Sequence, residues 1–325
     1  MPTSAALRAP RSGPGQTWLR RLTNGDEVAR LITLAFAATI LLLTGWLIYQ
    51  LWSTSAVPRH KFGFGFLTSS QWNPVEGQFG ALPFIYGTVI TSILSLLIAV
   101  PLGVGAAIFL SELAPPGTSS AFTFFIELLA AVPSVIYGVL AVFTLVPLMR
   151  DYVEPFLKKT LGFTALFSGP IFGFGYLTAA VILAIMTLPF IISISREALL
   201  EVPTEQREAA LALGATRWES TWQAVVPYAR LGIFGSVFLG LARALGETMA
   251  VTMVIGNDPS LHASLFSPGY TIAAVIANEF TEATGELYPQ ALVALGLVLF
   301  LLTIVINALA RLLIIATTRR GSAHP

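Results

Sequence analysis

Six long apolar runs constrain the fold of this chain more than any other feature. Each run is about 20 residues or longer, which is the length of helix needed to cross roughly 30 Å of hydrocarbon. The runs lie at about Val28–Trp52, Leu82–Leu113, Ser120–Met149, Tyr176–Ser195, Tyr228–Ile255 and Tyr288–Ala316. The pattern therefore predicts an all-α membrane protein with six transmembrane helices.

The composition agrees with a membrane protein and excludes several other classes. Only 11% of the residues are charged, whereas soluble domains average about 25%. The net charge of +1 provides no large basic field for nucleic acid. Cysteine is absent, so neither disulfides nor thiolate metal sites can form.

Catalytic clusters are also missing from the sequence. The three histidines lie outside the apolar runs, and no His or Asp residues show the close spacing of a metal or catalytic cluster. A membrane enzyme is therefore poorly supported. No lysine follows a glycine, so a Walker A loop cannot be built and any ATP chemistry must be done by another chain.

Arginines at the two ends of the chain predict its orientation in the membrane. Four arginines precede the first run, and two follow the last run. Because positive charge collects on the cytoplasmic side, we expect both termini in the cytoplasm. This orientation divides the chain into a cytoplasmic tail over 1–27, a first span over 28–52, an external loop over 53–81, a membrane domain over 82–316 and a cytoplasmic tail over 317–325.

A charged and interrupted stretch, EAALALGATRWESTWQAVVP at 208–227, separates two apolar runs on the cytoplasmic side. Gly214 is suited to the left-handed conformation that ends a helix. Thr216 and Glu219 have the spacing of a capping box, which begins another helix. We therefore expect a short helix, a glycine elbow and a second short helix that leads to Pro227 and the fifth span.

The first of these helices suits contact with another protein. Ala209 and Ala210 leave a surface of low relief, which lets a partner approach the backbone. The charges of Glu205, Arg207 and Glu208 would fix the register of such a contact. The alternative is an amphipathic helix on lipid headgroups, but the stretch has little bulky apolar surface and carries charges of both signs.

The same stretch resembles the EAA signature of permease subunits of ATP-binding-cassette importers. Glu208, Ala209, Ala210, Gly214 and Pro227 all match that signature, whereas Ala224 and Val226 stand where Ile and Leu are usual. In that family the loop, here residues 197–227, inserts into a cleft on the ATPase subunit. The resemblance therefore implies a coupling role, and a type I importer permease fold with a MetI-like core.

Longer strings resemble the PstC family of phosphate-importer permease subunits. They include GFGFLTSSQWNPV at 63–75, AVPLGVGAAIFLSELAP at 99–115 and RALGETMAVTMVIGN at 243–257. The resemblance implies a plasma (inner) membrane protein that forms half of a pathway for inorganic phosphate. It also implies a PstA-like permease partner in a heterodimer, two PstB-like ATPase subunits that bind ATP and Mg, and an external PstS-like phosphate-binding protein.

Other transporters remain as alternatives. An importer for sulfate, molybdate or phosphonate is not separated from a phosphate importer by these residues, because selection would lie in the binding protein. A secondary transporter would not need the EAA loop, and the chain lacks the paired broken helices of an inverted repeat.

Two charged residues in the fifth apolar run are candidates for the substrate pathway. We predict that Arg243 and Glu247 lie one helical turn apart on one face. A guanidinium suits a phosphate, and the carboxylate would keep the anion from binding permanently. The alternative is a structural ion pair. For Glu127, in the third run before Pro133, we favour a structural role.

Overall fold

The computed structural model describes residues 26–321, with side chains over 27–312. The arginines that predicted a cytoplasmic N-terminus in the tail 1–27, and residues 322–325 of the predicted C-terminal tail, lie outside the described residues. The chain divides into one unit over 1–53 and another over 54–325. The first unit contains α2 (Asp26–Thr54), whose most apolar window is not buried, as expected for a helix solvated by lipid.

The described part of the chain contains six helices that are long and apolar enough to cross a membrane. They are Glu27–Thr54, Leu82–Leu113, Ser134–Leu161, Tyr176–Leu200, Arg217–Gly246 and Leu287–Leu312. The expected spans over 28–52, 82–113, 176–195 and 288–316 therefore correspond to observed helices, whereas the third and fifth differ.

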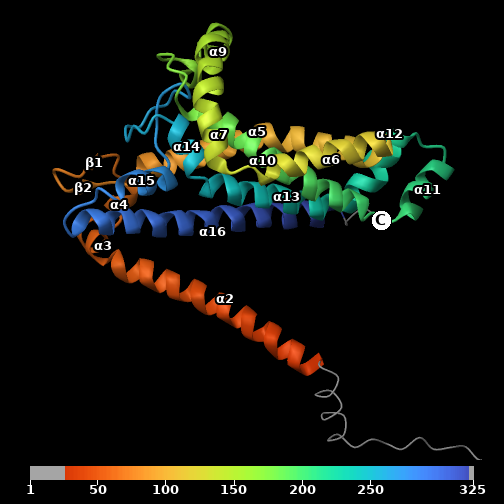
Figure 1. Ribbon diagram of the computed structural model, residues 1–325, viewed down its shortest axis with the longest axis horizontal. Helices are drawn as coiled ribbons and strands as arrows, with labels where there is room; N and C mark the ends of the chain where they lie inside the picture. Colours follow the sequence, from red (N-terminus) through yellow and green to blue (C-terminus); the bar gives the residue numbers. More distant parts are fainter. Residues whose placement is uncertain (1–25, 322–325) are drawn as a thin grey trace, which may run out of the picture. The chain divides into compact units, whose positions relative to one another are not determined.

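The second unit contains a bundle of four long helices: α5 (Leu82–Ile108), α10 (Tyr176–Leu200), α13 (Val226–Gly246) and α16 (Leu287–Gly321) (Figure 1). The helix α10 packs against both α5 and α13. Small residues allow these contacts, since a Cβ atom on Gly232 would lie 2.3 Å from Cβ of Ala198. Beside this contact, the hydroxyls of Ser195 and Ser236 join α10 to α13 at 2.7 Å. Close backbones and a buried polar bond are typical of helix association in membranes.

One end of the bundle is closed by short elements around an aromatic core. These elements are α3 (Ala56–Phe62), α4 (Gly65–Thr68), strands β1 (Trp72–Asn73) and β2 (Gln78–Phe79), and α15 (Ile272–Glu279). The strands are antiparallel and pair Trp72 with Phe79. The indole of Trp72 donates to Glu279 at 2.9 Å, and the hydroxyl of Tyr288 donates to the same carboxylate oxygen at 2.6 Å.

The opposite end carries the predicted coupling segment. Figure 1 shows α11 (Thr204–Ala212) and α12 (Arg217–Ser220) at the end of the bundle remote from β1, β2 and α15. A small cluster of buried residues from α5, α10 and α13 closes the bundle beneath them, and it includes Ile108, Leu199 and Ala229. The bundle therefore places the coupling segment directly on the ends of three long helices.

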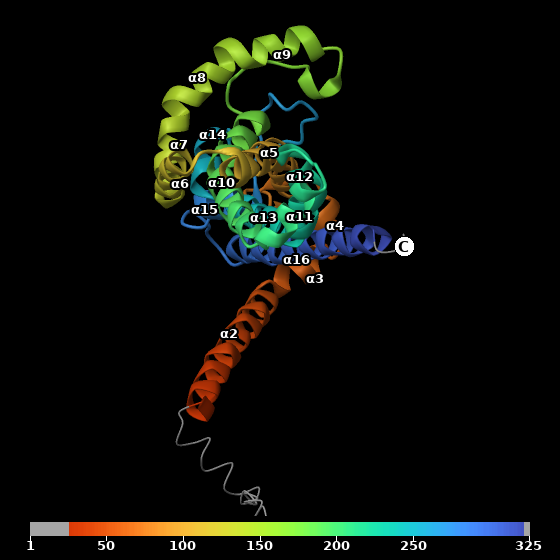
Figure 2. The same ribbon diagram turned by 90° about the vertical axis from the view of Figure 1, so that its right-hand side faces the viewer.

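The third span does not extend over 120–149 as predicted, because the chain leaves the helical conformation before Pro133 and the third long apolar helix begins at Ser134. The helix α6 (Pro116–Ala131) ends before Val132, which is extended at ψ 128°. Pro133 causes this break, because a proline removes a helical N–H and disfavours a helical conformation in the residue before it. A second helical stretch follows, with α7 (Ser134–Leu140), α8 (Val146–Leu148) and α9 (Glu154–Leu161). This stretch turns away from the bundle in both views (Figures 1 and 2).

The fifth span is also displaced from its predicted position over 228–255. Its helix begins at Arg217 and ends at Gly246. Glu247 is extended, with ψ 127°, and a separate helix, α14 (Met249–Val254), follows it. An apolar composition on both sides of the break concealed it from sequence analysis.

Four π-helical turns in the described chain each end two residues before a proline. The turns are η1 (Phe109–Leu113), η2 (Ala141–Leu145), η3 (Met149–Val153) and η5 (Thr221–Val225), which precede Pro115, Pro147, Pro155 and Pro227. A proline lacks its N–H and crowds the carbonyl four residues earlier. A widened turn relieves that crowding, and the last three prolines are thereby accommodated within continuing helices. A short 3₁₀ turn, η4 (Ala165–Phe167), lies in the loop before α10.

Candidate functional site

The elbow at Gly214 has the predicted conformation. Its φ is +89°, in the left-handed region, and the backbone around it forms a Schellman motif. In this motif the N–H of Ala215 donates to Ala210 at 3.2 Å, and that of Gly214 donates to Leu211 at 2.9 Å. No heavy atom lies within 4 Å of a Cβ built on Gly214. The glycine is therefore required by backbone conformation and not by lack of space.

The capping box predicted after the elbow is also present. The hydroxyl of Thr216 accepts from the N–H of Glu219 at 3.3 Å, and the Glu219 carboxylate accepts from the N–H of Thr216 at 2.8 Å. These reciprocal bonds satisfy two donors that a helix N-terminus leaves without partners. They begin α12, which continues through η5 into α13.

The helix α11 is open to the surroundings over its whole length. None of its side chains is buried, and Glu208 and Ala209 are exposed. Leu213, just beyond the helix, is 90% exposed. A helix with an uncovered apolar end and flat alanine positions has the properties of a docking element.

Arg207 attaches α11 to the bundle. We had predicted that it would face outward and contact a partner, and this prediction is wrong. Its guanidinium makes a two-pronged contact with Glu112, at 3.1 Å from Nε and 2.8 Å from the second nitrogen. The same guanidinium donates to the backbone carbonyl of Leu199 at 2.7 Å and to that of Val202. Hydrogen bonding to Glu112 raises the pKa of Arg207, which is therefore positively charged at physiological pH.

This contact joins three elements at one point. Glu112 lies in η1 at the end of α5, whereas Leu199 belongs to the last turn of α10. The side chain of Glu112 is 9% exposed and that of Arg207 is 22% exposed, so both charges are largely removed from water. Sequence analysis did not identify Glu112, because its partner is 95 residues away along the chain.

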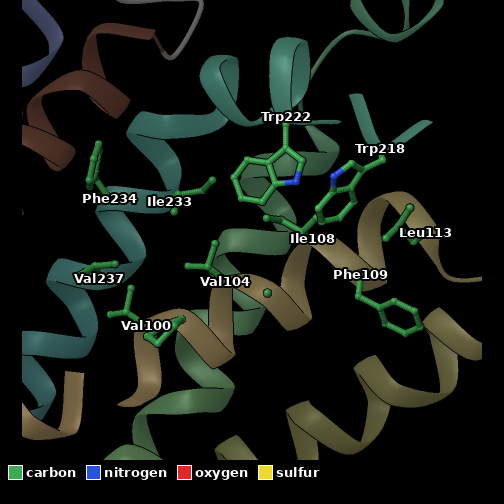
Figure 3. Close-up of a pocket in the computed structure, with 12 residues that line it drawn as sticks. Val100, Val104, Ile108, Phe109, Leu113, Trp218, Trp222, Ile233, Phe234 and Val237 are labelled. Atoms are coloured by element: carbon green, nitrogen blue, oxygen red, sulfur yellow. The ribbon is translucent and has the colours of Figure 1, made fainter. Parts of the chain in front are cut away.

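Two tryptophans attach the other half of the coupling segment. Trp218 of α12 and Trp222 of η5 meet edge to face, with ring centroids 5.6 Å apart. Figure 3 shows both indoles beside Ile108 and Val104 of α5, in an apolar pocket of about 590 Å³ that α13 closes from the other side. Their spacing of four residues places them on one helix face, and this signal was available in the sequence.

Arg243 lies in α13 with part of its hydrogen-bonding capacity unused. Its guanidinium carbon is 4.2 Å from the ring centroid of Phe190 on α10. Its Nε is buried and has no hydrogen-bond partner among the described residues. A buried donor without a partner is costly, so this arginine has capacity for an additional acceptor.

Glu247 does not form the predicted pair with Arg243 on one helix face. Because α13 ends at Gly246, the two side chains do not share a continuous helix. No ion pair joins them among the described residues. The carboxylate instead lies near the start of α14 and accepts from the N–H of Ala250 at 3.5 Å. The structural ion pair considered from the sequence is therefore not formed in this conformation.

The chain matches the family of binding-protein-dependent transport system inner membrane components over residues 99–315. It therefore belongs to that family. It is a multi-pass inner membrane protein and one component of an importer that has other subunits. The prediction of a transport permease, not an enzyme, agrees with this membership.

Several relatives are similar over nearly their whole length. A phosphate transport system permease protein PstC from Mesorhizobium japonicum is 48% identical over 322 residues, 98% of this chain and 98% of the relative. A PstC protein from Xylella fastidiosa is 45% identical over 98% of this chain and 99% of its own. A probable PstC protein from Methanocaldococcus jannaschii is 36% identical over 89% of this chain and 93% of its own.

A solved structure supports the fold. It is that of a bacterial ABC transporter involved in the import of the acidic polysaccharide alginate. The TM-score is 0.60 at 17% identity, and the match covers 94% of this chain and 99% of the other. The predicted type I importer permease fold is confirmed by this likeness together with the family match.

Proposed function

We propose that this chain forms half of the transmembrane pathway for inorganic phosphate in an ATP-driven importer. The observation that carries the proposal is the full-length similarity, at 48% identity, to a permease protein of a phosphate transport system. The arginine with unused donors in the bundle is consistent with an anionic substrate.

The proposed assembly contains four further subunits around this chain. A homologous PstA-like permease completes the pathway, and two PstB-like ATPase subunits bind ATP and Mg. An external PstS-like protein delivers phosphate. The chain itself holds no cofactor in this proposal, because its sequence cannot form a Walker A loop.

The proposed coupling element is the segment 197–227, with Glu208, Ala209, Ala210, Gly214 and Pro227 as the residues of its signature. The exposed helix α11 would enter a cleft on the ATPase subunit, and the elbow at Gly214 would set its angle. When the ATPase subunits close, the movement of α11 would pass to α5 and α10 through Arg207, and to α5 and α13 through the two tryptophans.

The proposed substrate contact is Arg243. A guanidinium can bind two phosphate oxygens in a planar fork, which a point charge cannot do. Glu247 is near in sequence but is not bonded to Arg243, so it would weaken anion binding without occupying the arginine. A pathway needs such moderate binding, because an anion that is held too tightly does not leave.

The proposed orientation places both termini and α11 in the cytoplasm, with β1, β2 and α15 outside. It can be tested with single cysteines, because the native chain has none. Positions 70, 206 and 282 are all exposed in the structure. An impermeant thiol reagent added to intact cells should label positions 70 and 282 but not position 206. External labelling at 206 would reverse the orientation.

The proposed function is tested by uptake of radioactive phosphate into vesicles that contain the complete complex, with and without this chain. Uptake should require three components. These are this chain, the binding protein, and ATP on the side of the membrane where the ATPase subunits lie. Excess sulfate, molybdate or phosphonate should not compete. Competition by one of these anions, with little phosphate uptake, would assign the importer to that oxyanion.

A further inference from the structure

A polar pocket lies between α6 and α10, at the same end of the bundle as the coupling segment. Its volume is about 480 Å³, and its polar lining consists of Ser119, Ser120, Thr123, Glu127 and Arg196. This pocket is separate from the tryptophan pocket and shares no lining residue with it. It is also far larger than the roughly 30 Å³ that one water molecule occupies in the liquid.

One side of the pocket is formed by a polar stripe on α6. Ser119, Thr123 and Glu127 are spaced by four residues, so they follow one face of α6 toward α10. Polar side chains are uncommon in a membrane helix and usually face a protein interior or a water-filled cavity. The stripe therefore indicates a hydrated cavity and not a lipid contact.

Arg196 is the cation of this pocket, and its hydrogen bonds are incomplete. Its Nε is buried without a partner among the described residues. One terminal nitrogen donates to the hydroxyl of Ser119 at 3.4 Å, which is long for a hydrogen bond. No ion pair joins Arg196 to Glu127 in the described structure.

The hydroxyls around Arg196 do not satisfy it. Ser119 is buried and donates to the carbonyl of Leu110 at 2.8 Å, while Thr123 donates to the carbonyl of Ser119 at 2.8 Å. These bonds hold the two side chains in place beside the guanidinium. The exposed hydroxyl of Ser120 lines the same pocket and can donate to an anion. An arginine whose donors are incompletely bonded, together with a nearby serine hydroxyl, can bind a tetrahedral oxyanion.

We propose that Arg196 and Ser120, in the pocket also lined by Ser119 and Thr123, form a second site, which binds a phosphate group at the cytoplasmic end of the bundle. Glu127 lies two turns of α6 beyond Ser119 and limits the affinity by repulsion. The phosphate group belongs either to the transported anion on its way out or to the headgroup of a membrane lipid. The first source rests on the proposed function, whereas the second does not.

The test uses the complete complex without ATP and a single cysteine at position 123. In maltoside micelles, which contain no phosphate, the rate of modification by a neutral thiol reagent is measured with inorganic phosphate or with chloride at equal ionic strength. If the transported anion occupies the site, phosphate slows modification about threefold or more. If a lipid fills the site, protection appears without added phosphate in nanodiscs that contain phosphatidylglycerol.

Three further variants make the result specific. Arg196→Gln should abolish protection from either source, whereas Glu127→Gln should increase it. Arg230→Gln, which removes an exposed arginine on α13 near the same end, should leave protection unchanged. A control cysteine at position 122, which does not line the pocket, should be modified at one rate under all conditions.

The proposal is overturned if modification at position 123 is insensitive to phosphate and to phosphatidylglycerol, or if protection survives Arg196→Gln. Because this assay measures occupancy without transport, its result is independent of the uptake assay. A complex that shows Arg196-dependent protection but no phosphate uptake would keep the site and reject the proposed function.

Discussion

Arg207 and Arg243 occupy similar half-buried positions but differ in how completely they are bonded. The guanidinium of Arg207 donates hydrogen bonds to one carboxylate and two backbone carbonyls. Arg243 rests on an aromatic ring and keeps a buried Nε without a described partner. A guanidinium with four of its five donors bonded within the chain stabilises structure, whereas one with more unused donors has the capacity to bind a ligand. The first should therefore matter for coupling and the second for substrate.

The largest effect is expected at Arg243. Arg243→Gln should reduce phosphate uptake about 100-fold or more, since charge-assisted hydrogen bonds contribute about 1.5–3 kcal/mol each. Arg243→Lys should be impaired but active, because it keeps the charge and loses the fork. The measurement is uptake divided by the amount of inserted protein.

The double variant Arg243→Gln with Glu247→Gln separates the two roles considered for this pair. We expect normal insertion and poor transport, since no ion pair joins the residues in this structure. Near-normal uptake in the double variant would identify a structural pair and remove Arg243 from the substrate pathway.

Arg207→Gln should have the next largest effect, and it should act on coupling. The change leaves Glu112 without its partner in a largely buried position, which costs about 1–3 kcal/mol. We expect roughly tenfold less phosphate transported per ATP hydrolysed, together with easier loss of the ATPase subunits. Arg207→Lys should transport more phosphate per ATP hydrolysed than Arg207→Gln does, but less than the native chain.

The matched control is Arg217→Gln, because Arg217 is exposed in the same segment. If Arg207→Gln leaves the amount of phosphate transported per ATP hydrolysed unchanged, the contact with Glu112 does not transmit the movement of α11 to the bundle. A binding defect at Arg243 would instead lower uptake and substrate-stimulated hydrolysis together, so the two arginines are distinguished by this ratio.

Gly214→Val should have a smaller effect on the same quantities. A side chain in the left-handed region costs about 1–2 kcal/mol, which corresponds to roughly a 5- to 30-fold change in the population of the correct elbow. Uptake and retention of the ATPase subunits should both fall, while the helices remain inserted. Gly235→Val provides the control, because Gly235 also has open surroundings but lies within a helix.

The smallest effect is expected at Trp222. This side chain is 48% exposed, so Trp222→Phe should retain most of the apolar contact with α5 and change uptake less than about twofold. Trp222→Ala should reduce uptake several-fold. Equal loss in both variants would show that the indole itself, and not the apolar contact, is required.

Local signals allowed the elbow and the capping box to be predicted from the sequence. Gly214, Thr216 and Glu219 act over three or four residues, so their spacing is sufficient. The predicted bounds of the third and fifth spans were wrong because apolar sequence continues on both sides of a break in the helix. The breaks lie at Val132–Pro133 and at Gly246–Glu247. Proline marked the first break, although we placed a span across it. Nothing in the local sequence marked Glu112 as the partner of Arg207, because that contact depends on tertiary packing.

The contact of Gly232 with Ala198, and the serine bridge beside it, have a mechanical consequence. The two helices joined there, α10 and α13, are also the helices that lead into and out of the coupling segment. With backbones this close, neither helix can slide past the other without a collision. If the segment couples to an ATPase as proposed, a push there would enter a stiff hairpin at its closed end. Such a hairpin would tilt as one lever, so a small displacement at its tip would become a rotation along its whole length.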